Sequence, residues 1–199
     1  MTTMTGARFL AETVHGYGLT HVFFMPYIAP RALMEMEKLG IRRIQTHGEK
    51  AAAYMADAYA RVRRGPALCM AQSVGALNLA AGLQDAYLAC SPVIAITGRE
   101  LLHNQQRHAY QEVDHTGPFS AVTKFRAYIS GPEYLPQHLR QAFRSAMSGT
   151  PGPVHLDLEG IAGQAVVDAE TDFEVIVEGM YSQLPPLRPE AEVEQVLAA

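Results

Sequence analysis

The segment RRIQTHGEKAAAYMADAYARVRRG, residues 42–65, decides the fold that we expect for this chain. Its first part, which contains Ile44, is typical of a short strand. Its second part has apolar residues at the helical spacing of three and four, namely Ala52, Met55, Tyr59 and Val62. Glu49 follows His47 and Gly48 at the point where the predicted strand passes into the predicted helix. The position of a carboxylate at this junction has either a structural or a chemical explanation.

The same alternation continues on both sides of this segment. Further apolar runs predict strands at about 20–26, 66–73, 92–98, 121–129 and 152–159. Helical patterns lie between them, and Thr5 is a suitable N-cap for a first helix that ends near Gly16. Strands that alternate with helices, with continuous apolar runs, predict an α/β fold of three layers, in which a mainly parallel sheet has helices on both faces.

The alternation weakens after about residue 163. We therefore expect a first domain over residues 1–163, and a linker with the start of a truncated or separate central domain over residues 164–199. A long polar connection, residues 99–118, interrupts the first domain, and segments of this length are often functional. Taken singly, its histidines are expected to be solvated loop residues, namely His103, His108 and His115.

The composition excludes several classes of protein. Hydrophobic residues make up 48% of the 199 residues and charged residues 18%, which is typical of a globular chain. The formal net charge is −4, and the only short basic run is Arg61–Arg64, so we expect no nucleic-acid partner. No apolar run has the length of a membrane span, and the N-terminus is a poor signal peptide. Cys69 and Cys90 lie in apolar segments and are expected to be reduced, as in a cytoplasmic protein.

Ligands of parallel sheets bind beyond the carboxyl ends of the strands. The glycine-rich loops of dinucleotide and nucleoside triphosphate sites are absent there, and so are zinc-ligand spacing and a G-x-S-x-G elbow. Glu49 remains, with Ser73, Asn78 and Gln111 as polar neighbours. From position alone, Glu49 can simply be a favourable charge at a helix N-terminus, Ser73 a helix cap and Asn78 a buried hydrogen-bonding residue.

Three segments together resemble a known family. They are HGEKAAAYMADAYARVRRGPALCMAQSVGALNLAAGLQDAYLACSPVIAITG (residues 47–98), AYQEVDHTGPFSAVTKF (109–125) and GTPGPVHLDLE (149–159). In this order and spacing they resemble the N-terminal, pyrimidine-binding domain of thiamine diphosphate enzymes of the acetolactate synthase and pyruvate oxidase type. The resemblance covers about residues 5–160.

The resemblance implies a catalytic role for Glu49. In these enzymes a glutamate at this position shares a proton with a ring nitrogen of the cofactor's aminopyrimidine, which prepares the cofactor to lose its carbon-bound proton. Such a carboxyl group works best when it is partly removed from water. Met25, Tyr54 and Val74 are candidates for the apolar wall that does this, and Gly48 would allow close approach of the ring.

Other positions carry over one at a time as cofactor-binding residues. Besides Glu49 they are Pro26, Tyr27, Ser73, Val74, Asn78 and Gln111. Three of them depart from the family pattern. Tyr27 stands where the family has a glycine, Ser73 where it has another glycine, and Val74 where it has a proline. The departures leave the cofactor role in place and put the identity of the substrate in doubt.

The resemblance also implies a partner. In the family, a second domain marked by a Gly-Asp-Gly sequence holds the diphosphate and its Mg²⁺, and this chain contains no such sequence and no metal ligands of that kind. We therefore expect the chain to be the pyrimidine-binding part of a carboligase or decarboxylase acting on a 2-oxo acid. A diphosphate-binding domain or subunit would complete it in a homo-oligomer or hetero-oligomer, and the chain alone would be inactive.

Two alternatives remain open at this point. The chain can be a non-catalytic assembly or regulatory module of such a complex, in which Glu49 has lost its role. It can also be an unrelated nucleotide-binding domain, although the glycine-free first turn MPYIAP argues against this.

Overall fold

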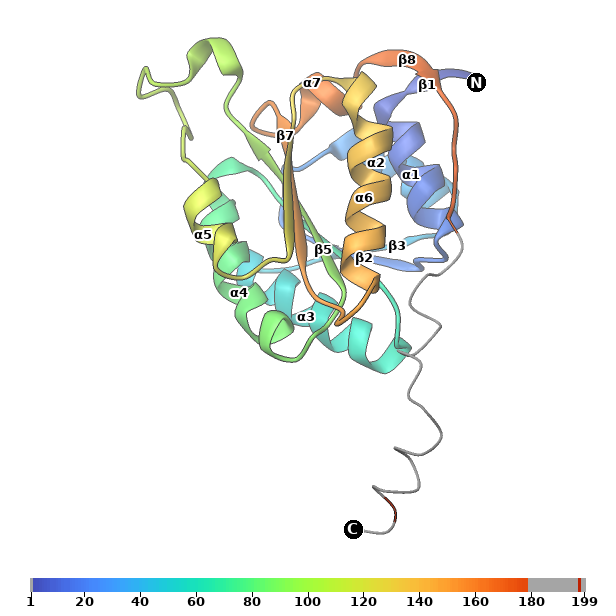
Figure 1. Ribbon diagram of the computed structural model, residues 1–199. Coiled ribbons are helices and arrows are strands. Elements are labelled where there is room, and N and C mark those ends of the chain that lie inside the picture. The colour runs from blue at the N-terminus through green and yellow to red at the C-terminus, as the bar shows by residue number, and fades with distance from the viewer. Residues whose placement is uncertain (1, 179–196, 198–199) are drawn as a thin grey trace.

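A computed structural model describes residues 2–178 and residue 197 (Figure 1). The helices and strands in chain order are β1 (Thr2–Thr5), α1 (Gly6–Gly16), β2 (His21–Phe24), α2 (Pro30–Lys38), β3 (Arg42–Gln45), α3 (Glu49–Arg63), β4 (Ala67–Ala71), η1 (Ser73–Gly75), α4 (Ala76–Leu88), β5 (Val93–Arg99), η2 (Leu102–Asn104), α5 (Thr116–Ser120), β6 (Phe125–Ile129), η3 (Pro132–Tyr134), α6 (Leu135–Met147), β7 (Val154–Glu159), α7 (Gln164–Val167) and β8 (Glu170–Phe173). The label η marks short 3₁₀ helices. No helix among the described residues is long and apolar enough to cross a bilayer.

The central sheet confirms the predicted fold class. Its six strands follow the order β3-β2-β4-β5-β7-β6, and each neighbouring pair is parallel. The expected N-cap is also present, because Thr5 Oγ1 accepts a hydrogen bond from Arg8 N at 3.2 Å.

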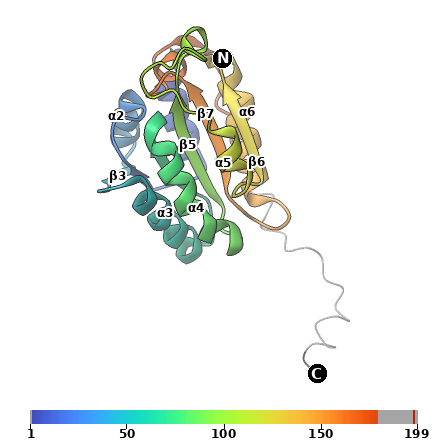
Figure 2. The same cartoon turned by 90° about the vertical axis from the view of Figure 1, so that its left-hand side faces the viewer.

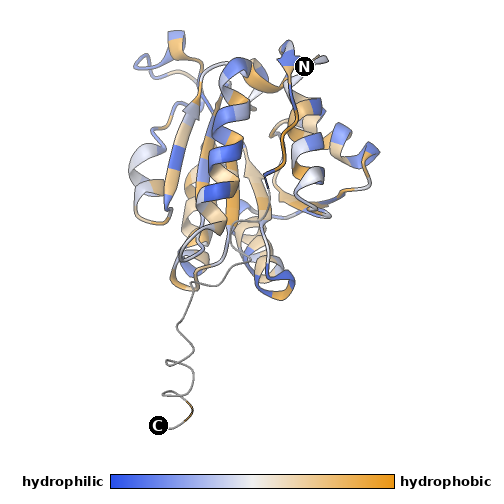
Figure 3. Cartoon of the chain, turned by 45° about the vertical axis from the view of Figure 1, so that its right-hand side comes forward, coloured by the Kyte–Doolittle hydropathy of each residue, from blue (hydrophilic) through white to orange (hydrophobic). Residues whose placement is uncertain are grey.

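Helices cover the two faces of this sheet and make a three-layer domain (Figures 1 and 2). On one face α1, α2, α6 and α7 share a core with the aliphatic side chains of the strands. On the other face α3, α4 and α5 share a second core that is rich in alanine. β4 is buried along its whole length, whereas the edge strands β3 and β6 are partly exposed. Hydrophobic residues, coloured orange, are frequent in the strands of the middle layer, as expected for strands that are buried on both faces (Figure 3).

The buried face of α3 differs from the one that the spacing predicts. Met55 is 45% exposed and Val62 is 89% exposed, while the buried positions are Ala52, Ala53, Ala56, Asp57 and Ala60. The reason is the close packing of α3 on α4. A Cβ atom on Gly82 of α4 would lie 2.7 Å from Cβ of Ala53 and 2.8 Å from the carbonyl oxygen of Lys50. Only small side chains fit between helices at this distance, so the alanines face inward and larger residues face out.

The segment after residue 163 also differs from the expectation of a linker. β8 pairs with β1 in an antiparallel two-stranded sheet, with Thr2 opposite Phe173. Val166, Val167 and Phe173 are buried in the core beneath α1. Residues 164–173 therefore pack on the first domain. The predicted start of a central domain falls mainly on residues outside those that the structure describes.

The strand order reverses between β2 and β4. From β2 the chain moves through α2 to β3 on one side, then crosses with α3 to β4 on the other side. The helices of the two directions lie on opposite faces of the sheet, α2 on one and α3 on the other. This switch point is where a ligand of such a sheet binds, and it is where the predicted site residues follow their strands.

Candidate functional site

Loops from across the sheet meet at this switch point and are joined through their main chains. Ala29 N, after β2, donates to Ala162 O at 2.9 Å, and Ser73 N, after β4, donates to Ile161 O at 3.1 Å. The close approach needs a glycine in β5, because a Cβ atom on Gly98 would lie 2.4 Å from Ile161 O. The loop after β7 therefore supports both the loop after β2 and the loop after β4.

Glu49 is the first residue of α3 and is half-buried at this edge of the sheet. Asn78, in the first turn of α4, donates from Nδ2 to Glu49 Oε2 at 3.2 Å. The other carboxylate oxygen lies against Gly75, where an added Cβ atom would be only 2.5 Å from Oε1. The positive end of α3 lies at the same carboxylate and favours its negative charge. Glu49 is thus held by Asn78 of α4 and by Gly75, which precedes α4.

Gln72 is a residue that the sequence places after a strand without showing its role. Its Oε1 accepts a hydrogen bond from Tyr27 N at 3.1 Å, and its Nε2 donates to Gln111 Oε1 at 3.1 Å. Ser73 Oγ donates to Gln111 O at 2.6 Å, and Gln111 has a positive φ of 62°. Gln72 and Ser73 therefore bind the loop after β2 and the loop after β5 to the end of β4. The signal available in the sequence was a buried-strand end followed by two hydrogen-bonding side chains.

A carboxylate also organises the loop that carries Gln111. Glu112 accepts hydrogen bonds from the main-chain N–H groups of Gln106, Arg107 and Ala109, the last at 3.0 Å. The bonds from Gln106 and Ala109 lower the pKa of Glu112, so its carboxylate stays ionised at neutral pH. This loop is compact because one side chain satisfies three of its N–H groups.

The remaining predicted site residues line the solvent side of this group. Pro26 lies two residues after the end of β2 and precedes Tyr27, whose side chain is 74% exposed. Val74 is 52% exposed and Tyr54 is 41% exposed. The apolar wall expected around Glu49 is therefore not closed by Tyr54 and Val74 within this chain. The roles of Pro26, Tyr27 and Val74 toward a ligand stay predictions.

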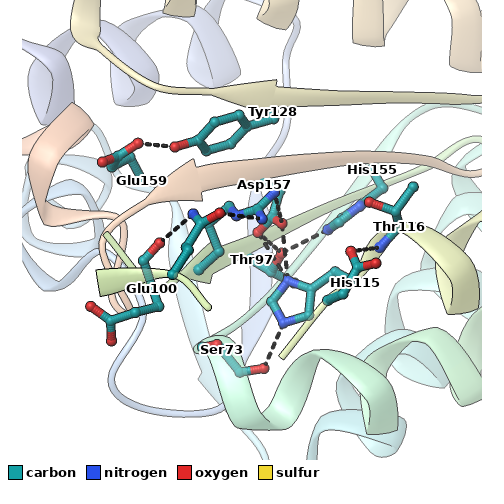
Figure 4. A network of polar contacts seen from close by, with 12 residues as sticks. Ser73, Thr97, Glu100, His115, Thr116, Tyr128, His155, Asp157 and Glu159 are labelled. Carbon is teal, nitrogen blue, oxygen red and sulfur yellow. Dashed lines mark hydrogen bonds and ion pairs between the residues drawn. The ribbon is translucent and has the colours of Figure 1, made fainter. Parts of the chain in front are cut away.

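His115 corrects an expectation, because it is buried with 1% exposure and is not a solvated loop residue. It lies between Asp157 of β7 and the main chain of Ser73 (Figure 4). Asp157 also accepts a hydrogen bond from Thr97 at 2.8 Å, and Thr97 contacts His155 at 2.6 Å. The alternation of apolar and polar residues in VHLDLE, residues 154–159, was the signal in the sequence for a polar face on β7.

The same residues form the one possible metal-ligand group found among the described residues. The ligand atoms of His115, His155 and Asp157 lie within 4.8 Å of one another. Each of these three side chains already has a hydrogen-bond partner within the protein, and Arg99 Nη1 lies 3.8 Å from Asp157 Oδ2. A cation there would have to displace these bonds beside an arginine, so we assign the group to a hydrogen-bond network.

Comparisons with known proteins agree with this geometry. Residues 4–117 match the family described as "Thiamine pyrophosphate enzyme, N-terminal TPP binding domain", which covers more than half of the chain. The chain is 35% identical over 188 residues to a "Probable acetolactate synthase large subunit" of Methanocaldococcus jannaschii, which covers 94% of this chain and 31% of that protein. It is 36% identical over 170 residues to the "Acetolactate synthase isozyme 1 large subunit" of Escherichia coli, covering 84% of this chain and 30% of that protein.

An "Acetolactate synthase" of Arthrospira platensis is similar to the same degree, with 35% identity over 171 residues that cover 83% of this chain and 30% of that protein. The chain thus spans about a third of the length of the curated relatives that it matches. The match to the family includes Glu49, Gln72, Gly75 and Asn78, the residues that meet at the switch point. The chain belongs to the family of N-terminal TPP-binding domains of thiamine pyrophosphate enzymes.

Proposed function

We propose that this chain is the pyrimidine-binding part of a thiamine diphosphate-dependent enzyme, a carboligase or decarboxylase that acts on a 2-oxo acid and resembles acetolactate synthase. The observation that carries the proposal is the fixed carboxylate of Glu49, held by Asn78 and Gly75 at the switch point of the sheet. A glutamate that only stabilises a helix N-terminus would not need a glycine in the η1 turn against its carboxylate, as Gly75 is here.

The residues present fit an aminopyrimidine ring. Glu49 offers a carboxylate oxygen to a ring nitrogen, and Gly48, where an added Cβ would meet nothing within 4 Å, leaves room beside it. Tyr27 and Val74 present exposed apolar surface that a ring can cover. When bound, thiamine diphosphate supplies the carbon nucleophile that attacks a 2-oxo acid. Glu49 would hold and exchange a proton at its carboxylate, and Asn78 would keep that group aimed.

The rest of the cofactor needs groups that we place outside this chain. A diphosphate group bound with Mg²⁺ requires oxygen ligands for the metal and donors for the phosphate, and we propose that a diphosphate-binding domain or subunit supplies both. The length of the relatives, about three times that of the matched region, supports such a second part. The chain alone would then bind the cofactor weakly and would not turn over substrate.

An apolar surface on α3 and α4 supports contact with another subunit. It is formed by exposed large side chains, namely Tyr54, Met55, Val62, Leu77 and Leu88. Leu77 and Leu88 also line a hollow of about 530 Å³ between α4 and α5, which is mostly apolar. Exposed apolar surface of this kind marks interaction sites. We propose that a second subunit covers it, in a homo-oligomer or hetero-oligomer, and also closes the water side of Glu49. The free cysteines Cys69 and Cys90 fit a reducing, cytoplasmic location.

The test of the function is a Glu49→Gln variant in the assembled enzyme, meaning this chain together with the chain or segment that carries the diphosphate site. Glutamine keeps the hydrogen bond with Asn78 but cannot exchange a proton, so we expect the fold to persist and activity on 2-oxo acids to fall by about 100-fold or more. Glu133→Gln, an exposed glutamate outside this site, is the matched control and should leave activity unchanged.

The outcome separates this proposal from the non-catalytic alternative. Full activity of the Glu49→Gln enzyme, or of a partner that needs no copy of this chain, would favour an assembly or regulatory module. Calorimetry with thiamine diphosphate and Mg²⁺ on the 199-residue chain alone should show little binding. Tight binding there would contradict the division of the site between two parts.

A further inference from the structure

A buried histidine connects the middle of the sheet to the turn that contacts Glu49. His115 Nδ1 lies 3.0 Å from Asp157 Oδ2 and 3.1 Å from Asp157 Oδ1. Its other ring nitrogen, Nε2, lies 3.1 Å from the carbonyl oxygen of Ser73 (Figure 4). The side chain of His115 is 1% exposed, so its ring nitrogens bond to these protein groups and not to solvent water.

Both neighbours of the ring can only accept hydrogen bonds. The carbonyl oxygen of Ser73 has no proton to donate. Burial by itself would raise the pKa of Asp157, but the hydrogen bonds with His115 and from Thr97 bring it below its usual value. Asp157 is therefore a carboxylate at neutral pH. In a neutral imidazole one ring nitrogen carries no proton, so its lone pair would face an acceptor oxygen at about 3 Å. An imidazolium instead donates a hydrogen bond both to Asp157 and to the Ser73 carbonyl.

The other groups around the ring are consistent with one positive charge on His115. The Thr97 hydroxyl donates its proton to Asp157, so its oxygen accepts a hydrogen bond from His155 Nε2. Burial lowers the pKa of His155 to about 3, in agreement with this assignment. The rings of His115 and Phe119 pack edge to face. The carboxylate in direct contact with the His115 ring is that of Asp157.

Charges of both signs lie slightly further away. Arg99 Nη1 is 3.8 Å from Asp157 Oδ2, and Arg126 lines the same hollow of about 280 Å³ as His115. Asp114, the residue before His115, adds a negative charge next to the ring. The two arginines disfavour a further cation, while Asp114 and Asp157 favour it. The two contacts to acceptors favour the imidazolium, because only this form donates a hydrogen bond from both nitrogens.

Ser73, the residue that His115 reaches, is fixed from three directions. Its N–H donates to Ile161 O at 3.1 Å, its Oγ donates to Gln111 O at 2.6 Å, and its carbonyl accepts from His115. It begins the η1 turn, whose last residue, Gly75, lies against the Glu49 carboxylate. Movement of Ser73 would therefore be passed to the contact that holds Glu49.

We propose that His115 is a positioning residue: as a buried imidazolium it ties Asp157 to the main chain of Ser73 and so holds the Ser73–Gly75 turn against Glu49. The chemical role of Glu49 rests on the proposed function, whereas the charge on His115 and its effect on the turn do not. Loss of the ring proton removes one of the two donors. Without one of these donors the turn loosens, although the sheet itself is unchanged.

The first test reads the ring directly. Nitrogen-15 NMR of the full chain should show both nitrogens of His115 protonated at pH 7, with the shifts of an imidazolium. In Asp157→Asn the counter-charge is gone, and His115 should become a neutral imidazole at the same pH. An unprotonated nitrogen on His115 of the native chain at pH 7 would overturn the proposal, whatever the function of Glu49.

The second test reads the turn and the enzyme. Hydrogen exchange at the Ser73 and Gly75 amides, corrected for the intrinsic rate, should become faster in His115→Gln and in Asp157→Asn and remain native in the control His103→Gln. In the assembled enzyme kcat/KM should fall by about 10- to 100-fold in both variants, since displacement of a catalytic group costs this much.

Native exchange at the turn in both variants would show that His115 does not position it and would overturn the proposal. If His115→Gln does not fold, Asp157→Asn and the spectrum of the native ring still decide. An inactive native enzyme with a protonated His115 would instead count against the proposed function alone.

Discussion

Gly75 and Glu49 fit together so closely that a single methyl group on Gly75 would lie 2.5 Å from the Oε1 atom of Glu49 and 2.7 Å from its Cδ. The two residues belong to separate helical segments, η1 after β4 and α3 after β3, and β2 lies between these two strands in the sheet. The carboxylate position is therefore set by the main chain of another loop. This contact restricts the position of the Glu49 carboxylate, and a substitution of Gly75 tests whether that position matters.

Gly75→Ala should displace the Glu49 side chain and reduce the activity of the assembled enzyme by about 10- to 100-fold, because the carboxylate would leave its position. Kinetics and thermal unfolding of the same preparation measure the two effects separately. Gly117→Ala is the matched control, since an added Cβ there meets nothing within 4 Å. Native activity in Gly75→Ala would mean that the position of Glu49 against this turn has no importance.

Gln72→Ala should loosen two loops at once, because Gln72 bonds both Tyr27 N and Gln111 Oε1. Loss of a bridging side chain leaves its partners exposed to solvent exchange. Hydrogen exchange followed by mass spectrometry should show faster exchange in the segments that contain Tyr27 and Gln111. Gln84→Ala is the control, as Gln84 bonds only within α4 to Ala81 O among the contacts described. Faster exchange in only one of the two loops would refute the bridging role.

His155 should make the stability of the chain depend on pH in mildly acid solution. Burial lowers its pKa from 6.5 to about 3, so the unfolded chain binds a proton between these values that the folded chain does not. The stabilisation is complete above pH 6.5 and decreases as the pH falls toward 3, by up to about 1.4 kcal/mol for each pH unit.

Urea unfolding of the native chain and of His155→Gln at pH 7.5 and pH 5 checks this dependence. Glutamine keeps a donor for Thr97 but does not titrate, so the variant should lose less free energy of unfolding between the two pH values. Equal losses in both proteins would show that His155 is not a buried neutral histidine.

Gly82→Val should separate α3 from α4. A Cβ atom at this position already meets the Cβ of Ala53 at 2.7 Å and the carbonyl oxygen of Lys50 at 2.8 Å. Overpacking of this kind costs about 1–3 kcal/mol, which thermal or urea unfolding resolves. Substitution of the exposed Val62 by alanine is a suitable comparison on the same helix pair, and it should change the free energy of unfolding little. A fully stable Gly82→Val protein would contradict the close helix contact.

Much of the fold could be predicted from the sequence because its signals are local. Apolar runs that alternate with helical patterns, such as PALCMAQS (residues 66–73) and the helix after it, predict buried parallel strands and their covering helices. Glu49 could be chosen as the candidate acid for a similar reason, since it stands where a strand passes into a helix and no phosphate loop competes with it. Asn78 could be chosen from the family pattern, but its hydrogen bond with Glu49 is visible only in the structure.

The sequence by itself determined the order of the elements, the parallel sheet and the acidic residue at the strand end, because each depends on neighbours within a few turns of chain. The tertiary structure alone decided which groups surround that residue. His115 and Asp157 are 42 positions apart, and Thr3 and Asp172 are 169 positions apart, yet each pair is hydrogen-bonded. Burial and protonation depend on what covers a side chain in space, and that is fixed only when distant segments pack together.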